Sequence, residues 1–430
     1  MRPNTHEAGP LEGGTASSTS LTRSVLSYTT ATLLSQAAAI VQSILVIRWM
    51  DPAALGVWLG LQLIAIYGAY APLGILTGLN RQVPFHRGRK EFDHARRIED
   101  VARGSLLVLV VLGLGVVAVL TVLGLGSSQY GRGAIALGLA TVLTLGVRFH
   151  EVLFRARNEF GRAGLATVVN TAIVVAGLPL VYYWHYDGLL VRVVLASVLT
   201  LVACFAMNGW SLGVVFSWAE TRALMRVGLP IMAVTLALAT FVAMDRTLIL
   251  WLLDERSMGY YALCFAVAKV LKLFPTTIGQ VFYPRMTELY GAEGVRGQLL
   301  WRCVQASILS VVVVAITAVA AARMLPWAVT LWFPKYEAGL PALRIALIAY
   351  VVHSLAAGPT YFLITTMQKR RQLGSLLVGT VVMILVATQI VPRTLEGIAW
   401  SLVSGISVYV AGLWAIVLAS ARRAKVWPAQ

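Results

Sequence analysis

The chain has 430 residues, of which 58% are hydrophobic and only 12% are charged, and its formal net charge is +17. Soluble domains carry about 25% charged residues, so this composition excludes a large soluble domain and indicates a protein that crosses a membrane many times. The positive charge does not require nucleic acid as a partner, because the basic residues mostly flank apolar runs, as they do in cytoplasmic loops of membrane proteins.

Residues 1–22 are rich in Gly, Ser, Thr and Pro and predict a disordered tail. The tail lacks the apolar core of a secretory signal peptide, so the first apolar run is expected to act as an uncleaved signal anchor. Apolar runs of roughly 20 residues then recur to the end of the chain, each long enough to span a bilayer as a helix. We expect an all-α polytopic membrane protein with twelve spans, at approximately 24–47, 55–80, 104–126, 131–154, 163–185, 188–207, 228–252, 258–283, 303–324, 338–364, 372–391 and 396–420.

The distribution of Lys and Arg predicts the orientation of these spans. With the N-terminus in the cytoplasm, 23 of the 35 basic residues fall in cytoplasmic segments, six fall on the outer side and six fall inside spans. Positive residues gather on the cytoplasmic side of membrane proteins, so both termini are expected there. A missed span would scramble the alternation, and the asymmetry therefore also supports the count of twelve.

Two stretches of the chain resemble each other at an offset of 203 residues. Ile44–Asp51 is similar to Thr247–Asp254, and Gly56 and Gly259 each follow the Asp by five residues. Six spans separate the copies, which predicts two parallel six-helix lobes around a central cavity. The expected domains are an N-lobe at 23–207, a cytoplasmic linker at 208–227, a C-lobe at 228–421 and a short cytoplasmic tail at 422–430.

Charged residues inside the spans mark the expected cavity. Lys269 and Lys272 are three residues apart on one face of the eighth span, where a charge facing lipid costs about 3 kcal/mol. Asp245 and Arg246 lie in the seventh span. Six basic residues inside the spans, against two clear acids, favour an anionic cargo.

The stretch Ile47–Trp58 and the loop Tyr283–Tyr290 identify a resemblance to a known family. They resemble segments of polysaccharide-biosynthesis flippases of the Wzx type, within the multidrug/oligosaccharidyl-lipid/polysaccharide (MOP) exporter superfamily. In that family a Gly-Pro turn with an aromatic residue leads into the second span. Here Asp51-Pro52 and Leu55 stand at those positions, and the resemblance weakens over the last three spans.

The resemblance implies a fold like that of the MATE antiporters, with spans one, two, seven and eight lining the cavity. It also implies transport of undecaprenyl-diphosphate-linked glycan, as in O-antigen and lipopolysaccharide biosynthesis, from the inner to the outer leaflet of the cytoplasmic (inner) membrane. Expected partners are the lipid-linked oligosaccharide, membrane lipids and glycan polymerases or glycosyltransferases. No nucleic acid is expected.

Candidate site residues follow from these two arguments. Lys269, Lys272 and Arg246 are predicted to contact diphosphate or acidic sugars, and Asp245 is the candidate for binding a coupling ion. Arg48 ends the first span, where snorkelling to the interface explains it as well as substrate binding does. The remaining polar residues of the spans are weaker candidates: Arg148 and Glu151 as a structural pair, Arg192 and Arg344 as snorkelling side chains, and Gln62, Asn80 and Asn170 as contacts for sugar hydroxyls.

Several other functions are disfavoured. The chain has no G-x-x-x-x-G-K-[ST] motif for ATP and no catalytic or metal-binding spacing, so neither an enzyme nor a cofactor is expected. Cys204, Cys264 and Cys303 are predicted to be small core residues. A multidrug antiporter remains the alternative function, although cationic drugs would favour a cavity with more acids. A glycan polymerase would need a large outer loop, which the chain lacks.

Overall fold

The computed structural model describes residues 14–209, 213–295 and 297–426, and within them every regular element is helical. Ten helices are long and apolar enough to cross a membrane, and two shorter apolar helices, Pro52–Gly68 and Phe160–Ala176, lie at the positions of the expected second and fifth spans. The chain is therefore a multi-pass membrane protein with the predicted all-α, twelve-span organisation. The first 13 residues of the expected tail lie outside the described residues, and helix α1 begins inside that tail, at Gly14.

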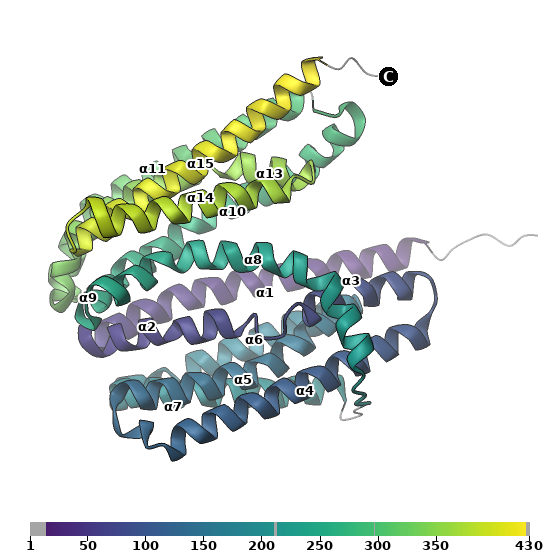
Figure 1. The fold of residues 1–430 in the computed structure, drawn as a ribbon, viewed down its shortest axis with the longest axis horizontal. Helices are drawn as coiled ribbons and strands as arrows, with labels where there is room; N and C mark the ends of the chain where they lie inside the picture. The colour runs from purple at the N-terminus through teal and green to yellow at the C-terminus, as the bar shows by residue number, and fades with distance from the viewer. Residues whose placement is uncertain (1–13, 210–212, 296, 427–430) are drawn as a thin grey trace, which may run out of the picture.

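The first half of the chain forms one group of helices (Figure 1). Its elements are α1 (Gly14–Trp49), α2 (Pro52–Gly68), α3 (Ile75–Gly88), α4 (Phe92–Val122), η1 (Leu125–Ser127), α5 (Gln129–Ala156), α6 (Phe160–Ala176) and α7 (Leu178–Asn208). The expected second span is broken between α2 and α3, where Leu73 and Gly74 have φ values of 45° and 87°. The expected turn between spans five and six lies inside α7, at the non-helical residue His185.

The second half forms the other group, with α8 in contact with both. Its elements are α8 (Trp218–Leu252), α9 (Glu255–Tyr260), α10 (Ala262–Glu293), α11 (Gly297–Trp332), η2 (Pro334–Gly339), α12 (Leu340–Ser354), α13 (Ala357–Thr365), α14 (Lys369–Leu385), the π-helical turn η3 (Val386–Ile390) and α15 (Leu395–Val426). Pro275 lies inside continuous α10, and the break in the expected eighth span falls earlier, at Tyr261.

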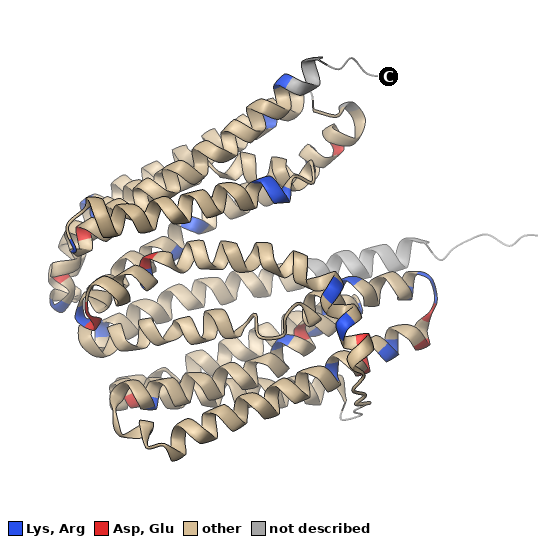
Figure 2. Cartoon of the chain, viewed as in Figure 1, with Lys and Arg blue, Asp and Glu red and all other residues tan. Residues whose placement is uncertain are grey.

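The two groups meet at one end of the molecule and diverge at the other (Figure 1). We call the first the junction end, where α2 and α9 begin, and the second the basic end. At the basic end lie the described ends of the chain and the Arg-rich segment around α3 and the start of α4 (Figure 2). This placement agrees with termini and basic loops on one side of the membrane. Which side that is stays a prediction.

The junction consists of the two repeated segments. Asp51 caps α2 by accepting a hydrogen bond from the Ala53 N–H (3.1 Å), and Asp254 caps α9 by accepting one from the Ser257 N–H (2.8 Å). Hydrogen bonds from Ser257 also hold the pKa of Asp254 below its usual value. Both turns therefore start a helix with a capping carboxylate.

Reciprocal glycine contacts join these two helices. A Cβ atom on Gly56 would lie 1.7 Å from the Glu255 carbonyl oxygen, and one on Gly259 would lie 1.8 Å from the Pro52 carbonyl oxygen. Pro52 and Glu255 are themselves separated by the 203-residue offset of the repeat. Small residues permit such close helix contacts in membranes, so the repeat detected in the sequence coincides with the symmetric contact between the halves.

Two large apolar clusters stabilise the groups, and a third, small cluster joins α5, α6 and α7. The larger extends from Val46 and Trp58 through the second half of the chain to Val417, and the smaller joins α3, α4, α5 and α8 at the basic end. All three cysteines are buried and free, as expected for small core residues. Many large apolar side chains on the outer faces of α4, α7 and α11 are exposed, as lipid-facing surfaces require.

Candidate functional site

A cavity of about 840 Å³ lies among α1, α2, α3, α5, α6, α7, α8 and α10. Its size falls within the range of small-molecule sites, about 300–1,000 Å³. Both halves of the chain contribute to its wall, but the first half supplies most of it. The cavity therefore lies between the halves and extends into the first.

The charges that line the cavity are predominantly positive. Five basic side chains line it, against a single acid, Glu151. The basic residues are Arg148, Arg155, Arg192, Arg246 and Lys269. In surroundings of low dielectric constant such charges act strongly on a ligand, so the cavity suits an anionic group.

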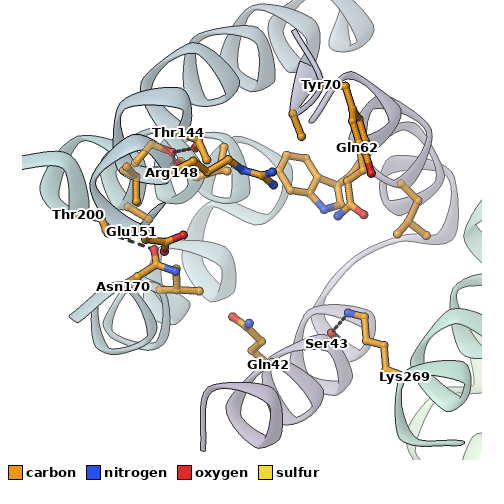
Figure 3. Close-up of a pocket in the computed structure, with 18 of the residues that line it drawn as sticks. Gln42, Ser43, Gln62, Tyr70, Thr144, Arg148, Glu151, Asn170, Thr200 and Lys269 are labelled. Atoms are coloured by element: carbon orange, nitrogen blue, oxygen red, sulfur yellow. Dashed lines mark hydrogen bonds between the residues drawn. The ribbon is translucent and has the colours of Figure 1, made fainter. Parts of the chain in front are cut away.

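Lys269 and Arg246 are the predicted site residues that the structure brings to the cavity. The Lys269 ammonium donates a hydrogen bond to the Ser43 hydroxyl of α1 (2.8 Å; Figure 3). The Arg246 guanidinium donates to the Gln62 side-chain oxygen of α2 (3.1 Å) and lies 4.2 Å from the centroid of the Phe265 ring. The hydrogen-bond partners of both cations are thus neutral. Arg246 also interacts electrostatically with the adjacent Asp245 carboxylate, so the charge of Lys269 in particular remains available to a ligand.

Lys272 is predicted to share the site with Lys269, but the structure places it elsewhere. It does not line the cavity, and its Nζ lies 5.4 Å from the centroid of the Tyr350 ring of α12. Residues three apart on a helix differ by about 60° in direction. Because α10 lies between α1 on one side and α12 on the other, that difference turns Lys269 to the cavity and Lys272 into the second half.

Asp245 and Arg48 also lie outside the cavity lining. Asp245 is 4% exposed, and its carboxylate accepts a hydrogen bond from the backbone N–H of Arg246 (2.8 Å). Arg48 is exposed in the last turn of α1, where a cation also interacts favourably with the helix dipole. A role for Arg48 in binding substrate within the cavity is therefore not supported by its position.

Part of the cavity wall lies on α5 and was not predicted from the sequence. Thr144, Arg148, Glu151 and Arg155 all line the cavity, and their spacing of four, three and four residues places them on one helix face. Arg148 and Glu151 were interpreted as a structural pair, so this face of the helix was not predicted to line the cavity. No ion pair joins these two residues among the described ion pairs, and the signal that was overlooked is the polar stripe itself.

The prediction for Arg192 was also wrong, because its side chain was expected to reach the membrane interface. It is 7% exposed and lines the cavity. Its guanidinium donates to the Val174 carbonyl (2.9 Å) and to the Gln42 side-chain oxygen. Arg344 is exposed, as a snorkelling side chain would be. Gln62, Asn80 and Asn170, the weaker candidates for sugar contacts, all line the cavity.

The described residues contain no group of three or more His, Cys, Asp or Glu side chains that would hold a metal ion. The arrangement is instead that of a ligand cavity with a cationic lining and many hydrogen-bonding side chains.

A family of known proteins matches the chain over residues 105–330, just over half of its length, and that family is described as "Polysaccharide biosynthesis protein". The chain belongs to this polysaccharide biosynthesis protein family. The expected membership in a polysaccharide-biosynthesis family is thereby confirmed. No curated protein matches the chain in sequence.

Solved structures of similar fold include transporters of the MOP superfamily. An inward-facing multidrug resistance MATE transporter of the MOP superfamily has a TM-score of 0.76 at 15% identity, over 92% of this chain and 96% of that one. The lipid II flippase MurJ in an inward closed conformation has a TM-score of 0.69 at 8% identity, over 93% and 90% of the two chains. These likenesses confirm the MATE-like fold.

A third similar structure is a MOP superfamily transporter from Pyrococcus furiosus, with a TM-score of 0.55 at 16% identity, over 94% of this chain and 95% of that one. That protein is described as having a binding pocket of reverse polarity that suggests a different function. At these identities the likeness concerns the fold, so the polarity of the present cavity must be judged from its own residues.

Proposed function

We propose that this polysaccharide biosynthesis protein moves undecaprenyl-diphosphate-linked glycan from the inner to the outer leaflet of the cytoplasmic membrane. The observation that carries the proposal is the cavity between the two halves, with five basic side chains and one acid. Family membership and the MOP fold support membrane transport in general. The cavity charge supports the anionic, diphosphate-bearing class of cargo.

The physical role of the cavity follows from the cost of moving charge across hydrocarbon. A diphosphate must lose much of its hydration to cross the bilayer, and cations in a protected cavity offset that loss. The lipid tail can stay in the bilayer while the headgroup passes through the cavity. The halves meet at the junction end and diverge at the basic end, as an alternating-access transporter would in one of its states.

Asp245 is proposed as the residue that binds a coupling ion. It is a buried acid within a membrane span, which is a functional position by default. Arg246 and Lys272 interact with it electrostatically, and no ion pair within 4.0 Å involves Asp245 among the described residues. Its charge is therefore only partly compensated, which leaves it able to bind a proton or a cation.

A multidrug or ion antiporter is the alternative, favoured by the similarity in fold to the MATE transporter. The charge of the cavity argues against it for cationic drugs, since the five basic residues would repel them. A glycan polymerase or ligase is disfavoured because the family and the similar structures point to transport. Glycan polymerases and glycosyltransferases are proposed as partners that use or supply the cargo.

Depletion of the protein in its host, followed by mass spectrometry of extracted lipids, tests the proposal. We expect undecaprenyl-diphosphate-linked glycan to accumulate, with its sugars inaccessible from outside the membrane. Changed drug susceptibility without such accumulation would favour the antiporter instead. Purified protein in liposomes should also make a fluorescent polyprenyl-diphosphate-linked sugar accessible to a membrane-impermeant reagent faster than protein-free liposomes do.

A further inference from the structure

The cavity has two chemically different sides. On one side Lys269 and Arg246 approach from the second half of the chain. On the other side lies a polar wall made by α5, α6 and α7, and we call its residues Thr144, Arg148, Glu151, Asn170, Ser197 and Thr200 the N-lobe wall. Figure 3 shows Glu151 and Asn170 on one side of the cavity and Lys269 with Ser43 on the other.

Glu151 is the most informative residue of the N-lobe wall. It is half-buried and lines the cavity, and no hydrogen bond or ion pair engages its carboxylate within the described part of the chain. Arg148 and Arg155 interact with it only electrostatically. A carboxylate that is withdrawn from water without a hydrogen-bond donor is costly. A ligand that donates hydrogen bonds would remove this cost.

The neighbouring side chains of the wall are held in place by one another. The Thr200 hydroxyl donates to the Asn170 side-chain oxygen (3.1 Å), and the hydroxyls of Thr144 and Ser197 are 3.4 Å apart. The Asn170 amide is thereby anchored through its oxygen, and its two N–H donors have no recorded acceptor among the described residues. The wall thus presents an acceptor, Glu151, and the amide donors of Asn170 on the same side of the cavity (Figure 3).

This combination matches neighbouring hydroxyl groups better than it matches an anion. A hydroxyl both donates and accepts a hydrogen bond, so one sugar hydroxyl can donate to Glu151 while the next accepts from Asn170 or Arg148. A phosphate or a uronic acid would place negative charge against Glu151, and such juxtapositions discriminate against the wrong ligand. On the opposite side the hydrogen-bond partners of the cations, Ser43 and Gln62, are neutral, and no acid of the described residues lines the cavity there.

We propose that the N-lobe wall is a subsite for a neutral sugar, recognised through adjacent hydroxyls by Glu151 and Asn170, while Lys269 and Arg246 bind the diphosphate. The inference rests on the proposed function and sharpens it. The sugar next to the diphosphate is assigned as uncharged, and the positive charges of Lys269 and Arg246 serve the diphosphate. Thr200 is a positioning residue that orients the Asn170 amide.

The separation of a sugar subsite from a diphosphate site can be tested with three lipid probes. Their binding is measured to the full-length purified protein in detergent. The probes are a short polyprenyl diphosphate, the same lipid carrying one neutral hexose, and the same lipid carrying one hexuronic acid. We expect Glu151→Gln to weaken binding of the hexose probe about ten-fold, which is about 1.4 kcal/mol. Its affinity for the sugar-free diphosphate should stay unchanged, and its affinity for the hexuronic acid probe should rise.

Two further variants keep the experiment decisive. Glu288→Gln makes the same chemical change at an exposed residue that pairs with Arg285 outside the cavity, and it should bind all three probes like the wild type. Thr200→Val removes the hydroxyl that holds Asn170 and keeps the size of the side chain. It should lower the affinity for the hexose probe alone, by a smaller factor than Glu151→Gln does. Thr200→Val carries the test if Glu151→Gln does not fold.

The possible failures are distinguishable. Equal loss of all probes in Glu151→Gln, or no loss of the hexose probe in either wall variant, would overturn the sugar subsite while leaving the diphosphate site intact. Preference of the wild type for the hexuronic acid probe over the hexose probe would also overturn it. Wild-type protein that binds none of the three probes would contradict the proposed function itself.

Discussion

The two halves of the chain contribute equally to the junction end but unequally to the cavity. At the junction end Gly56 meets the backbone of α9 and Gly259 meets the backbone of α2, so each repeat makes the same contact with the other. In the cavity the first half supplies the N-lobe wall, and the second half supplies chiefly Arg246 and Lys269 among the polar side chains. Close backbone packing preserves the symmetry of the repeat, whereas ligand recognition does not depend on it.

The means of stabilisation also differ between the halves. Six of the seven described ion pairs involve residues of the first half, and one of these, Glu99–Arg157, joins α4 to the loop after α5 with Glu99 almost fully buried. Among its described residues, the second half has one ion pair within itself, the exposed Arg285–Glu288, and it contributes most of the larger apolar cluster. The first half of the chain therefore contains both most of the ion pairs and the more polar side of the cavity.

Separate substitution of the two lysines gives the sharpest test of the cavity. Lys269→Ala should reduce transport of the lipid-linked glycan about 100-fold, because it removes a cation that faces the cargo. Lys272→Ala should retain far more transport, since Lys272 does not line the cavity. The measurement is glycan export in a strain that lacks the native gene, at matched protein levels in the membrane. Equal and complete loss in both would return Lys272 to the substrate site.

Alanine at Gly56 tests the symmetric junction. The added Cβ would lie 1.7 Å from the Glu255 carbonyl oxygen, so α2 and α9 must separate, and we expect the melting temperature in detergent to fall by roughly 5 °C or more. The control is Gly115→Ala, because a Cβ at Gly115 meets nothing within 4 Å. The same loss of stability in both variants would show that the junction is not tightly packed.

Glu99 tests the importance of ion pairs to the first half. Glu99→Gln removes the charge from a pair with Arg157, which also donates to the Asn208 side-chain oxygen (3.2 Å). Breaking a buried pair costs about 3 kcal/mol, whereas an exposed one contributes less than about 1 kcal/mol. Thermal unfolding should therefore show a clear loss for Glu99→Gln and almost none for Glu288→Gln. Identical unfolding curves for the two variants would contradict the conclusion that ion pairs stabilise the first half more than the second.

The smallest expected effect concerns Glu91 at the basic end. The hydrogen bond from His86 (2.5 Å) holds the pKa of Glu91 below its usual value. A lowered carboxylate pKa adds stability above the unfolded-state pKa, and that stability is lost as the pH falls through the folded-state pKa. Glu91→Gln should thus lower the melting temperature by about 1 °C at most near pH 7. The difference should shrink as the pH falls below about 4.3, the unfolded-state pKa, and vanish below the folded-state pKa. A difference that grows with acidity would contradict this assignment.

Much of the fold was predictable because a bilayer imposes strict rules on sequence. Span length, the flanking basic residues and the repeat around Asp51 and Asp254 predicted an all-α, two-lobed membrane protein. The breaks were harder to place. Pro275 remains inside a continuous helix, while Leu73 and Gly74 interrupt the second span. A proline removes one backbone donor, and whether the helix breaks depends on what its neighbours supply.

The site was predicted only in part, for a geometric reason. Charge in an apolar run identified Lys269 and Arg246, but spacing alone could not tell that Lys272 turns toward Tyr350 or that Arg192 is buried against Gln42. By itself the sequence determined the spans, the repeat and the sign of the cavity charge, because these depend on composition and periodicity. Only the tertiary structure decided which face of each helix reaches the cavity. Two residues three positions apart on a helix point about 60° apart, so one side chain can face the cavity while the other packs against a neighbouring helix.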